Sequence, residues 1–446
     1  MKSSLLLSLL GAAAPLFAAP TAAGQRQQEQ PSTLVRRASD PSQLVPNRFI
    51  VLLKPDTAAA EVAAHHAHVR RMVLTRRDGG STSSGGIDRV FHIGSDFSAY
   101  VGDFDDATAE AIARLPGVAS VEQDAIVTVE QTKPPSAAAA VARRAVQTQS
   151  EAPWQLGDIS HRDRGAKDYV YDGAAGAGSY VYVLDTGVRS SHAEFGGRVR
   201  FGINGLTGST AAPAPENRDR EGHGTHCAGL AAGATYGVAK KVEIVDVKVM
   251  GDNGAGTMSS VITGINWAVN DILSRNIQKK AVINLSLGSQ AIGSELTATE
   301  SAVIAAYNQG IASLCAAGNE DSPASTRSPG RIPQCITVGM TNAARSRASP
   351  RPRIFGSNYG PELDIFAPGD DVRAAGIASD SAIVAKSGTS MATPIVAGAV
   401  SYLRSIEGGL DTPEQVRARL VALSLKDVVG DVRDSPNRLL NNNSGL

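Results

Sequence analysis

Between residues 47 and 131, short apolar runs alternate with amphipathic helical stretches. The apolar runs "NRFIVLLK" and "IDRVFHI" flank the helical segment "TAAAEVAAHHAHVRRM", and the run "FSAYVGDF", a second helical segment and a last apolar run follow. The order strand, helix, strand, strand, helix, strand predicts a split ferredoxin-like α+β domain.

From residue 150 to residue 446 the pattern changes. Runs such as "SYVYVLD" and "AVINLSL" are apolar at consecutive positions and are separated by helical segments. Strands that are apolar on both faces belong to a parallel sheet covered by helices on both sides. We therefore predict an α/β fold here, with its chemistry at the carboxyl ends of the strands.

The segments outside these two domains differ in composition. Residues 1–20 combine a basic residue, a short apolar run and small residues, which predicts a cleaved secretory signal. Residues 21–46 are polar and expected to be disordered. Residues 132–149 are expected to form an unstructured processing linker with a dibasic pair, Arg143–Arg144. No other run is long and apolar enough to span a membrane.

Composition narrows the classes of function further. The chain has 446 residues, and its 43 basic residues balance its 43 acidic ones, so no global field favours nucleic acid. Its three cysteines allow at most one disulfide and match no zinc spacing.

Three glycine-rich segments each present a reactive side chain. "VLDTGV" places Asp185 at the end of an apolar run, "GHGTHCAG" places His223 before a small-residue helix, and "SGTSMATP" places Ser390 at a helix start. Imidazole is the base that can activate a serine hydroxyl near neutral pH, and a buried carboxylate orients it. Zinc binding by His223 with His226 would need a third ligand at a suitable spacing, and none is evident.

A fourth segment, "CAAGNED", ends another apolar run and presents Asn319. Its amide could donate to the oxyanion of a tetrahedral intermediate, together with the backbone N–H of Ser390.

With "YGVAKK", "VKVMGDNGAG", "SNYG" and "LDIFAPG", these motifs resemble the subtilisin-type serine proteases, and most closely the proteinase K-like branch. The order Asp, His, Ser is the one known from subtilisin. The resemblance implies a subtilisin-like fold at 150–446 and an inhibitory, folding-assisting propeptide at 47–131. In this interpretation Asp185, His223 and Ser390 are catalytic and Asn319 forms the oxyanion hole.

The implied function is a secreted, monomeric serine endopeptidase of broad specificity, made as an autoinhibited zymogen, that acts through an acyl-enzyme on Ser390. Its partners would be protein and peptide substrates and its own propeptide, with no nucleic acid and no membrane span. Its destination would be extracellular or, alternatively, vacuolar. A catalytically silent, subtilase-like binding protein is the alternative function.

The resemblance also implies a substrate cleft. Gly254, Gly256, Leu287 and Gly288 would hold an extended peptide by backbone hydrogen bonds, although the glycines could serve tight turns alone. Apolar or aromatic side chains before the scissile bond are expected, because no acidic residue in these segments is placed to bind arginine or lysine.

Calcium is the cofactor that the resemblance suggests. Its ligands would be the Asp364 carboxylate and the carbonyls of Ile332 and Gln334; alternatively, Asp364 caps a turn. For the cysteines, we predict three free thiols, with Cys227 buried beneath His223. A bridge between Cys315 and Cys335 would require facing side chains and Cα atoms within about 7 Å.

Three further expectations concern the surface. The basic segment 344–353 is expected to be a solvated loop, and Asn442 to be a glycosylation sequon in an exposed tail. His65, His66 and His68 lie on one helix, either facing solvent or acting as a pH trigger for propeptide release.

Overall fold

The computed structural model describes residues 34–36, 40–78, 85–129, 146–349 and 356–446, which belong to one compact unit. The predicted signal peptide and most of the predicted linker lie outside the described residues.

The amino-terminal domain has the predicted order of elements. These are β2 (Leu44–Leu53), α1 (Ala59–Asp78), β3 (Ile87–Ile93), β4 (Phe97–Asp103), α2 (Asp106–Ala113) and β5 (Val118–Thr128). The strands lie in the order β5-β2-β4-β3, and all three pairs are antiparallel. The ferredoxin-like prediction is therefore confirmed.

Alternation along β2 separates the two faces of this sheet. Phe49 and Val51 pack with residues of α1 and α2, whereas Ile50 packs in a second cluster with residues of α5 (Met258–Ser274) and α6 (Ala298–Asn308). One face of the sheet is thus covered by its own helices and the other by helices of the second domain.

Two segments expected to lack structure contain strands. In the segment 21–46, β1 (Leu34–Val35) pairs with β5, and β2 already begins at Leu44. In the segment 132–149, β6 (Val146–Gln149) pairs with β7 (Tyr169–Asp172). The expectation was wrong at these positions because an open strand edge offers backbone partners even to a polar segment.

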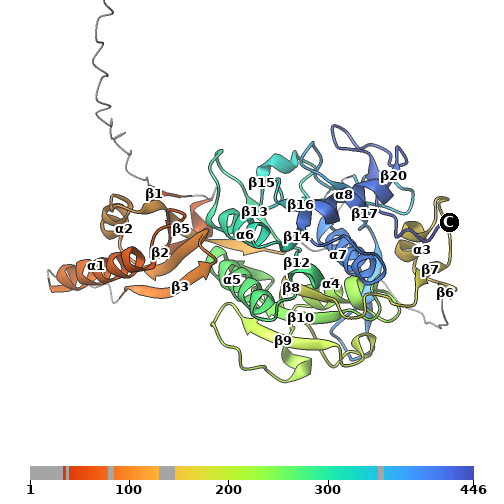
Figure 1. Ribbon diagram of the computed structural model, residues 1–446, viewed down its shortest axis with the longest axis horizontal. Coiled ribbons are helices and arrows are strands. Elements are labelled where there is room, and N and C mark those ends of the chain that lie inside the picture. Colours follow the sequence, from red (N-terminus) through yellow and green to blue (C-terminus); the bar gives the residue numbers. More distant parts are fainter. Residues whose placement is uncertain (1–33, 37–39, 79–84, 130–145, 350–355) are drawn as a thin grey trace, which may run out of the picture. The chain divides into compact units, whose positions relative to one another are not determined.

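The second domain is built on a nine-stranded sheet in the order β20-β21-β17-β16-β14-β12-β8-β10-β9, parallel except for β20 with β21 (Figure 1). The strands are β8 (Tyr180–Asp185), β9 (Val199–Asn204), β10 (Glu243–Lys248), β12 (Ala281–Leu285), β14 (Ala312–Ala316), β16 (Cys335–Thr341), β17 (Ile365–Pro368), β20 (Leu425–Lys426) and β21 (Arg438–Leu439).

Helices cover both faces of this sheet, as predicted. Val181 and Val183 of β8 pack with α4 (His223–Ala232) and α7 (Thr389–Ile406), whereas Tyr182 and Leu184 pack with α5 and α6. The remaining elements are α3 (Trp154–Ser160), α8 (Pro413–Leu423), β11 (Ala255–Thr257), β13 (Ser289–Gln290), β15 (Arg327–Ser328), β18 (Val372–Ala375), β19 (Ile383–Lys386) and short 3-10 turns.

The prediction of three free thiols is wrong, because Cys315 and Cys335 form a disulfide with Cα atoms 5.9 Å apart. In the parallel pair β14–β16, Cys315 lies opposite Thr337 and Cys335 lies opposite Ser313. The two cysteines are therefore offset by two positions, which puts both side chains on the same face of the sheet. Cys227 is buried and free.

The surface expectations also need correction. In the segment 344–353, Arg345 and Arg347 are buried ion-pair partners of Asp158 and Asp321, at 2.7 and 2.6 Å. Asn442 is fully buried and its Nδ2 donates to the Val170 carbonyl, so this nitrogen is not accessible for a glycan.

The three histidines of α1 do not share one environment. His68 faces solvent, His66 is buried, and His65 Nε2 lies 3.0 Å from the Tyr100 hydroxyl. Burial, with smaller contributions from His66 and His68, lowers the pKa of His65 to about 4. The solvent-facing expectation therefore holds for His68 alone.

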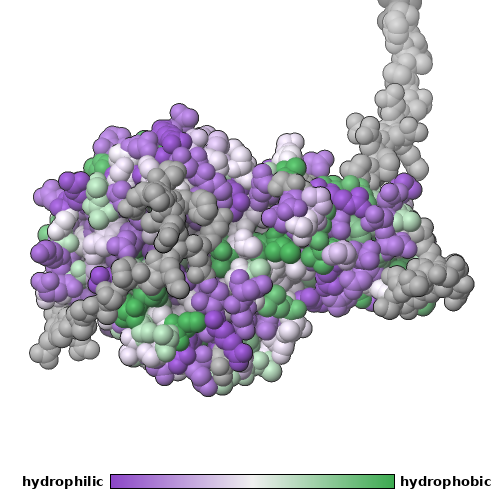
Figure 2. Space-filling model, turned by 180° about the vertical axis from the view of Figure 1, so that it is seen from behind, coloured by the Kyte–Doolittle hydropathy of each residue, from purple (hydrophilic) through white to green (hydrophobic). Residues whose placement is uncertain are grey.

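No helix among the described residues is long and apolar enough to cross a membrane. Apolar side chains on the face seen in Figure 2 form small patches among polar ones. Large apolar side chains of the described residues are mostly in the cores.

Candidate active site

Asp185, His223 and Ser390 stand at the ends of three elements, and Cys227 Sγ links the last two, 3.7 Å from His223 Nδ1 and 3.3 Å from the Ser390 carbonyl. Asp185 ends β8, His223 begins α4, and Ser390 is the second residue of α7. A Cβ on Gly224 would lie 2.2 Å from the Gly187 carbonyl oxygen and 3.0 Å from the Asp185 Cβ. Only glycine therefore lets the start of α4 approach the end of β8 this closely.

The imidazole and the carboxylate form a buried pair. His223 Nδ1 lies 2.8 Å from Asp185 Oδ1 and 3.0 Å from Oδ2, and both side chains are fully buried. An Nδ1–H that donates to the carboxylate leaves the lone pair of the ring on Nε2. His223 Nε2 has no hydrogen-bond partner among the described residues, so the nitrogen that could accept a proton is not committed elsewhere.

Ser390 is held at the start of α7 with its hydroxyl next to the cleft. Its Oγ donates to the Ser286 carbonyl over 3.0 Å, and its own carbonyl accepts from Ser286 Oγ and Cys227 Sγ at 2.8 and 3.3 Å. Burial, followed by the charge of Asp185, raises the pKa of the Cys227 thiol well above its usual value. Cys227 therefore supports Ser390 as a neutral thiol.

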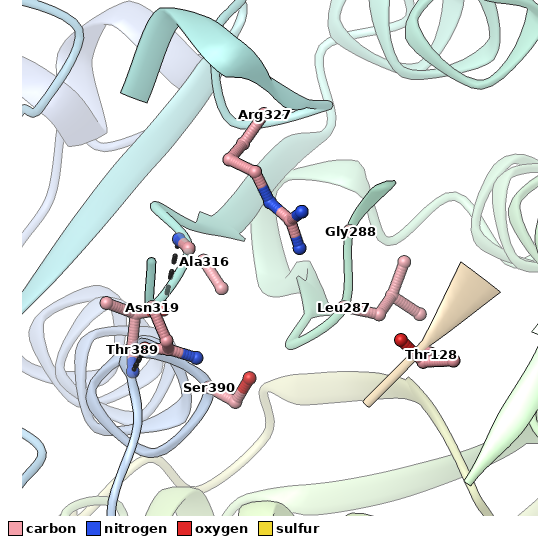
Figure 3. Close-up of a pocket in the computed structure, with 9 residues that line it drawn as sticks. Thr128, Leu287, Gly288, Ala316, Asn319, Arg327, Thr389 and Ser390 are labelled. Carbon is pink, nitrogen blue, oxygen red and sulfur yellow. Dashed lines mark hydrogen bonds between the residues drawn. The ribbon is translucent and has the colours of Figure 1, made fainter. Parts of the chain in front are cut away.

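Two N–H donors converge beside this hydroxyl. Asn319 Oδ1 accepts from the Thr389 amide at 2.7 Å, which directs its Nδ2 to the other side of the carboxamide. Asn319 and Ser390 line the same pocket (Figure 3). The Ser390 N–H lies in the first turn of α7, where backbone donors have no partner within the helix.

The loop before His223 is held by a buried aspartate that the sequence analysis missed. Asp219 accepts hydrogen bonds from the Gly222 amide, the Thr225 amide and two hydroxyls, among them that of Thr186 beside Asp185. Glu221 accepts from the His223 amide at 2.6 Å and is only 11% exposed. It thus binds the amide of the first residue of α4, a donor that has no partner within the helix. Most partners of Asp219 lie within six residues of it, in the segment that leads into "GHGTHCAG", so this short spacing was the available signal in the sequence.

The four cleft residues lie next to a strand of the amino-terminal domain. β11 pairs antiparallel with β5, matching Gly256 with Val127. The Val129 amide donates to the Gly254 carbonyl at 2.9 Å, and Thr128 forms a bridge with Gly288 on its other side. Leu287 and Thr128 also line the pocket beside Ser390. The end of the β5 segment thus lies between two cleft edges as an added strand.

The same pocket contains a residue that the sequence analysis did not single out. Arg327 lines it together with Thr128, Leu287, Gly288, Ala316, Gly318, Asn319, Thr389 and Ser390. Figure 3 shows its guanidinium pointing into the space between Asn319 and Leu287. None of the sequence motifs includes Arg327, so this position could not be predicted from them.

Two buried acids of β5 attach the amino-terminal domain to the second one. Asp124 accepts from Ser259 N and Oγ, at 3.1 and 2.6 Å, at the start of α5. Glu122 accepts from the Ala298 amide at 3.0 Å, at the start of α6. Each carboxylate satisfies backbone donors that a helix leaves unpaired at its start. Two acids in alternate positions of a buried strand were the available sequence signal.

The residues expected to bind calcium do not fit it. An Asp364 oxygen lies 3.1 Å from Arg417 Nε, and the same arginine donates to the Cys335 carbonyl. The Ile332 carbonyl accepts from the Cys335 amide, and Asp364 also accepts from the Thr337 amide. Within the described part of the chain, no hydrogen bond joins Gln334 to Asp364 or Arg417. A side-chain cation thus lies against the carboxylate that was expected to bind calcium.

Comparison with known proteins agrees with this arrangement. The model of the subtilase family matches residues 176–442, and the model of peptidase inhibitor I9 matches residues 48–130. Alkaline protease 1 of Aspergillus clavatus is 42% identical over 419 residues, covering 92% of this chain and 96% of that protein.

Two further matches point the same way. Subtilisin-like protease 1 of Pseudogymnoascus destructans is 37% identical over 444 residues, covering 99% of each chain. The crystal structure of a cold adapted subtilisin-like serine proteinase matches with a TM-score of 0.58 at 39% identity, covering 66% of this chain and 99% of that one. The chain therefore belongs to the subtilase family of serine proteases and is made as a zymogen with an I9 inhibitor domain at its amino-terminal end.

Proposed function

We propose that Ser390, His223 and Asp185, with Asn319, hydrolyse peptide bonds through an acyl-enzyme. The observation that carries this proposal is the buried Asp185–His223 pair beside a serine at a helix start. A serine hydroxyl needs such a base to become a nucleophile.

In the first step Ser390 Oγ turns from the Ser286 carbonyl to His223 Nε2. Oγ forms a bond to the substrate carbonyl carbon while its proton moves to Nε2, and Asp185 stabilises the resulting imidazolium. The oxyanion lies between Asn319 Nδ2 and the Ser390 N–H. His223 then gives the proton to the leaving amine as the C–N bond breaks. In the second half of the reaction, His223 takes a proton from water, which attacks the acyl carbon. The ester bond to Ser390 Oγ breaks, His223 returns the proton to Oγ, and the carboxylic acid product leaves.

The backbone pairing in the cleft supports broad specificity. The edges at Gly254–Gly256 and Leu287–Gly288 hold the end of the β5 segment through main-chain groups, which every peptide offers. The same pairing supports inhibition in place, because a substrate cannot enter while this segment lies there.

We further propose domain limits of 47–131 for the propeptide and 150–446 for the peptidase, with cleavage between Arg144 and Ser150. Since β6 pairs with β7, the mature chain would retain residues from about Val146. The secretory signal in the sequence supports export, to the exterior or to a vacuole. The mature protein would be a monomer. It would not need calcium at Asp364, because Arg417 already contacts this carboxylate.

Peptide hydrolysis by matched variants tests the proposal. Wild-type protein should process itself and cleave a casein-derived peptide, whereas Ser390→Ala should accumulate as precursor. Ser381→Ala removes an exposed serine and should behave as wild type. Processing and hydrolysis by Ser390→Ala at the wild-type rate would refute the assignment.

A further inference from the structure

We propose that Arg327 makes this protease favour an acidic side chain on the residue whose carbonyl is attacked. The proposal rests on the proposed function and adds a specificity-determining residue to it.

The position of Arg327 is set by a short β-ribbon next to the cleft. β15 begins at Arg327 and pairs with β13, so that Arg327 lies opposite Gln290, just after the cleft residue Gly288. A Cβ built on Gly318 would lie 2.8 Å from Arg327 Cγ, and one built on Gly288 would lie 4.0 Å from its Nη2. The side chain therefore passes Gly318 and ends near Gly288, and Figure 3 shows the guanidinium close to Gly288.

The pocket belongs to the substrate residue next to the scissile bond. Ser390, which would attack the carbonyl carbon, and Asn319, which would bind its oxygen, both line it. A side chain that enters between them must therefore come from the residue that carries this carbonyl.

Among the described residues that line the pocket, Arg327 alone is charged. Its side chain is 15% exposed, so an approaching charge is only partly screened by solvent. A planar guanidinium with five N–H donors matches the two oxygens of a carboxylate and can serve two carboxylates at once.

Arg327 forms an ion pair with Glu320, which lies outside the pocket lining. Its Oε1 lies 3.2 Å from Arg327 Nη2, while its Oε2 accepts from Asn358 Nδ2 and the Asn319 amide at 2.8 and 3.1 Å. Glu320 is not part of the pocket lining. It holds Arg327 in place but does not present a carboxylate to a basic substrate side chain.

This geometry changes the expectation drawn from the sequence. Leu287 and Ala316 still offer apolar wall to a leucine or phenylalanine side chain. The guanidinium, however, should favour glutamate over its neutral isostere glutamine and disfavour lysine. Because a hydrogen bond to a charged group is stronger than one to its neutral isostere and Glu320 offsets part of the gain, we expect roughly a tenfold preference for glutamate over glutamine.

The test compares processed enzyme on internally quenched peptides that differ only in the residue before the scissile bond: Glu, Gln, Leu or Lys. For wild type, kcat/KM should be about tenfold higher for Glu than for Gln, and the ratio should fall as salt is raised. In Arg327→Gln the Glu-to-Gln ratio should fall to about one. Arg433→Gln removes an arginine that pairs with Asp321 outside the pocket lining, and its ratio should match that of wild type.

The outcomes separate this inference from the proposed function. Equal rates for Glu and Gln in wild type, with rapid cleavage of the Leu peptide, would overturn the role of Arg327 alone. A preference for Glu that survives in Arg327→Gln would overturn it as well. Failure of wild type to cleave any peptide would instead count against the proposed function. Should Arg327→Gln not fold, the salt dependence of the wild-type ratio still decides, because a ratio insensitive to salt contradicts an ionic contact.

Discussion

At the scale of single residues, the site depends on which polar atoms already make hydrogen bonds within the protein. Asn319 uses its oxygen to bind the Thr389 amide, so its Nδ2 side is fixed without any substrate. Preorganised donors of this kind stabilise the charge that develops in the transition state.

Asn319→Leu should therefore lower kcat by about 10²–10³ with little change in KM, the effect that removal of the equivalent donor has in subtilisin, a member of the same family. Steady-state kinetics on one peptide substrate measure both constants. A rise in KM with kcat preserved would show that Asn319 binds the ground state instead.

A second residue-scale prediction concerns Asp246, which is fully buried in β10 and whose two oxygens make no hydrogen bond of ordinary geometry with any described residue. Burial raises the pKa of this carboxyl to about 8, and attraction to Arg218 only partly offsets the effect. A raised pKa means that the folded state favours the protonated form. The stability this form contributes is complete below the unfolded-state pKa near 4 and is lost as the pH rises to about 8.

Asp246→Asn should thus gain stability over its parent, by at most about 1.4 kcal/mol for each pH unit between 4 and 8. Denaturant unfolding of both proteins in the Ser390→Ala background, which avoids self-digestion, gives this difference. The exposed Asp434→Asn serves as the control. A constant difference between pH 4 and pH 8 would be inconsistent with a buried titrating carboxyl.

At the scale of elements, two helices of the peptidase domain begin against acids of the propeptide. Asp124 and Glu122 of β5 accept hydrogen bonds from the first turns of α5 and α6, in addition to the cleft pairing of β5. The inhibitor domain therefore binds the peptidase domain through the starts of α5 and α6 as well as through the end of β5 in the cleft.

Replacing these acids by amides should weaken inhibition. After cleavage of the linker, Asp124→Asn and Glu122→Gln should each speed dissociation of the propeptide about tenfold, since a charged hydrogen bond at a helix start contributes about 1–2 kcal/mol. Recovery of peptidase activity on dilution of the processed complex measures this rate. Glu110→Gln, on the exposed side of α2, is the control. Unchanged dissociation rates in both variants would show that the propeptide is held by the end of β5 alone.

The contact of Arg417 in α8 with Asp364 predicts how the fold responds to calcium. Because a guanidinium already neutralises this carboxylate, chelators and added calcium should leave the melting temperature of the wild type unchanged. Arg417→Met should lower it, since a partly buried carboxylate loses its partner, and added calcium should restore part of the loss. Thermal unfolding with and without chelator is the measurement. A wild-type melting temperature that falls in chelator would show that calcium does stabilise this chain.

Much at this scale could be predicted from the sequence, because the signals are local. Strand and helix periods lie within each segment, and motifs such as "GHGTHCAG" join a reactive residue to the glycines that position it. The predictions that were wrong depended on the register between strands and on partners that are distant in the sequence. The Cys315–Cys335 bridge follows from a two-residue offset between strands, and the partners of Asp364 and Asn442 come from α8 and β7.

At the scale of the whole molecule, one chain contains both the peptidase and the segment that blocks it. The Val127–Val129 backbone lies between the two cleft edges, and Thr128 lines the pocket that contains Ser390. The reactive hydroxyl should therefore be shielded until the amino-terminal domain is released.

Labelling with a fluorophosphonate tests this account most directly. We predict that the processed protein, freed of its propeptide, incorporates one label per chain, located on Ser390 by mass spectrometry of the peptide that contains it. The intact precursor should label far more slowly. Absence of label on processed protein, or label on any serine other than Ser390, would contradict the account.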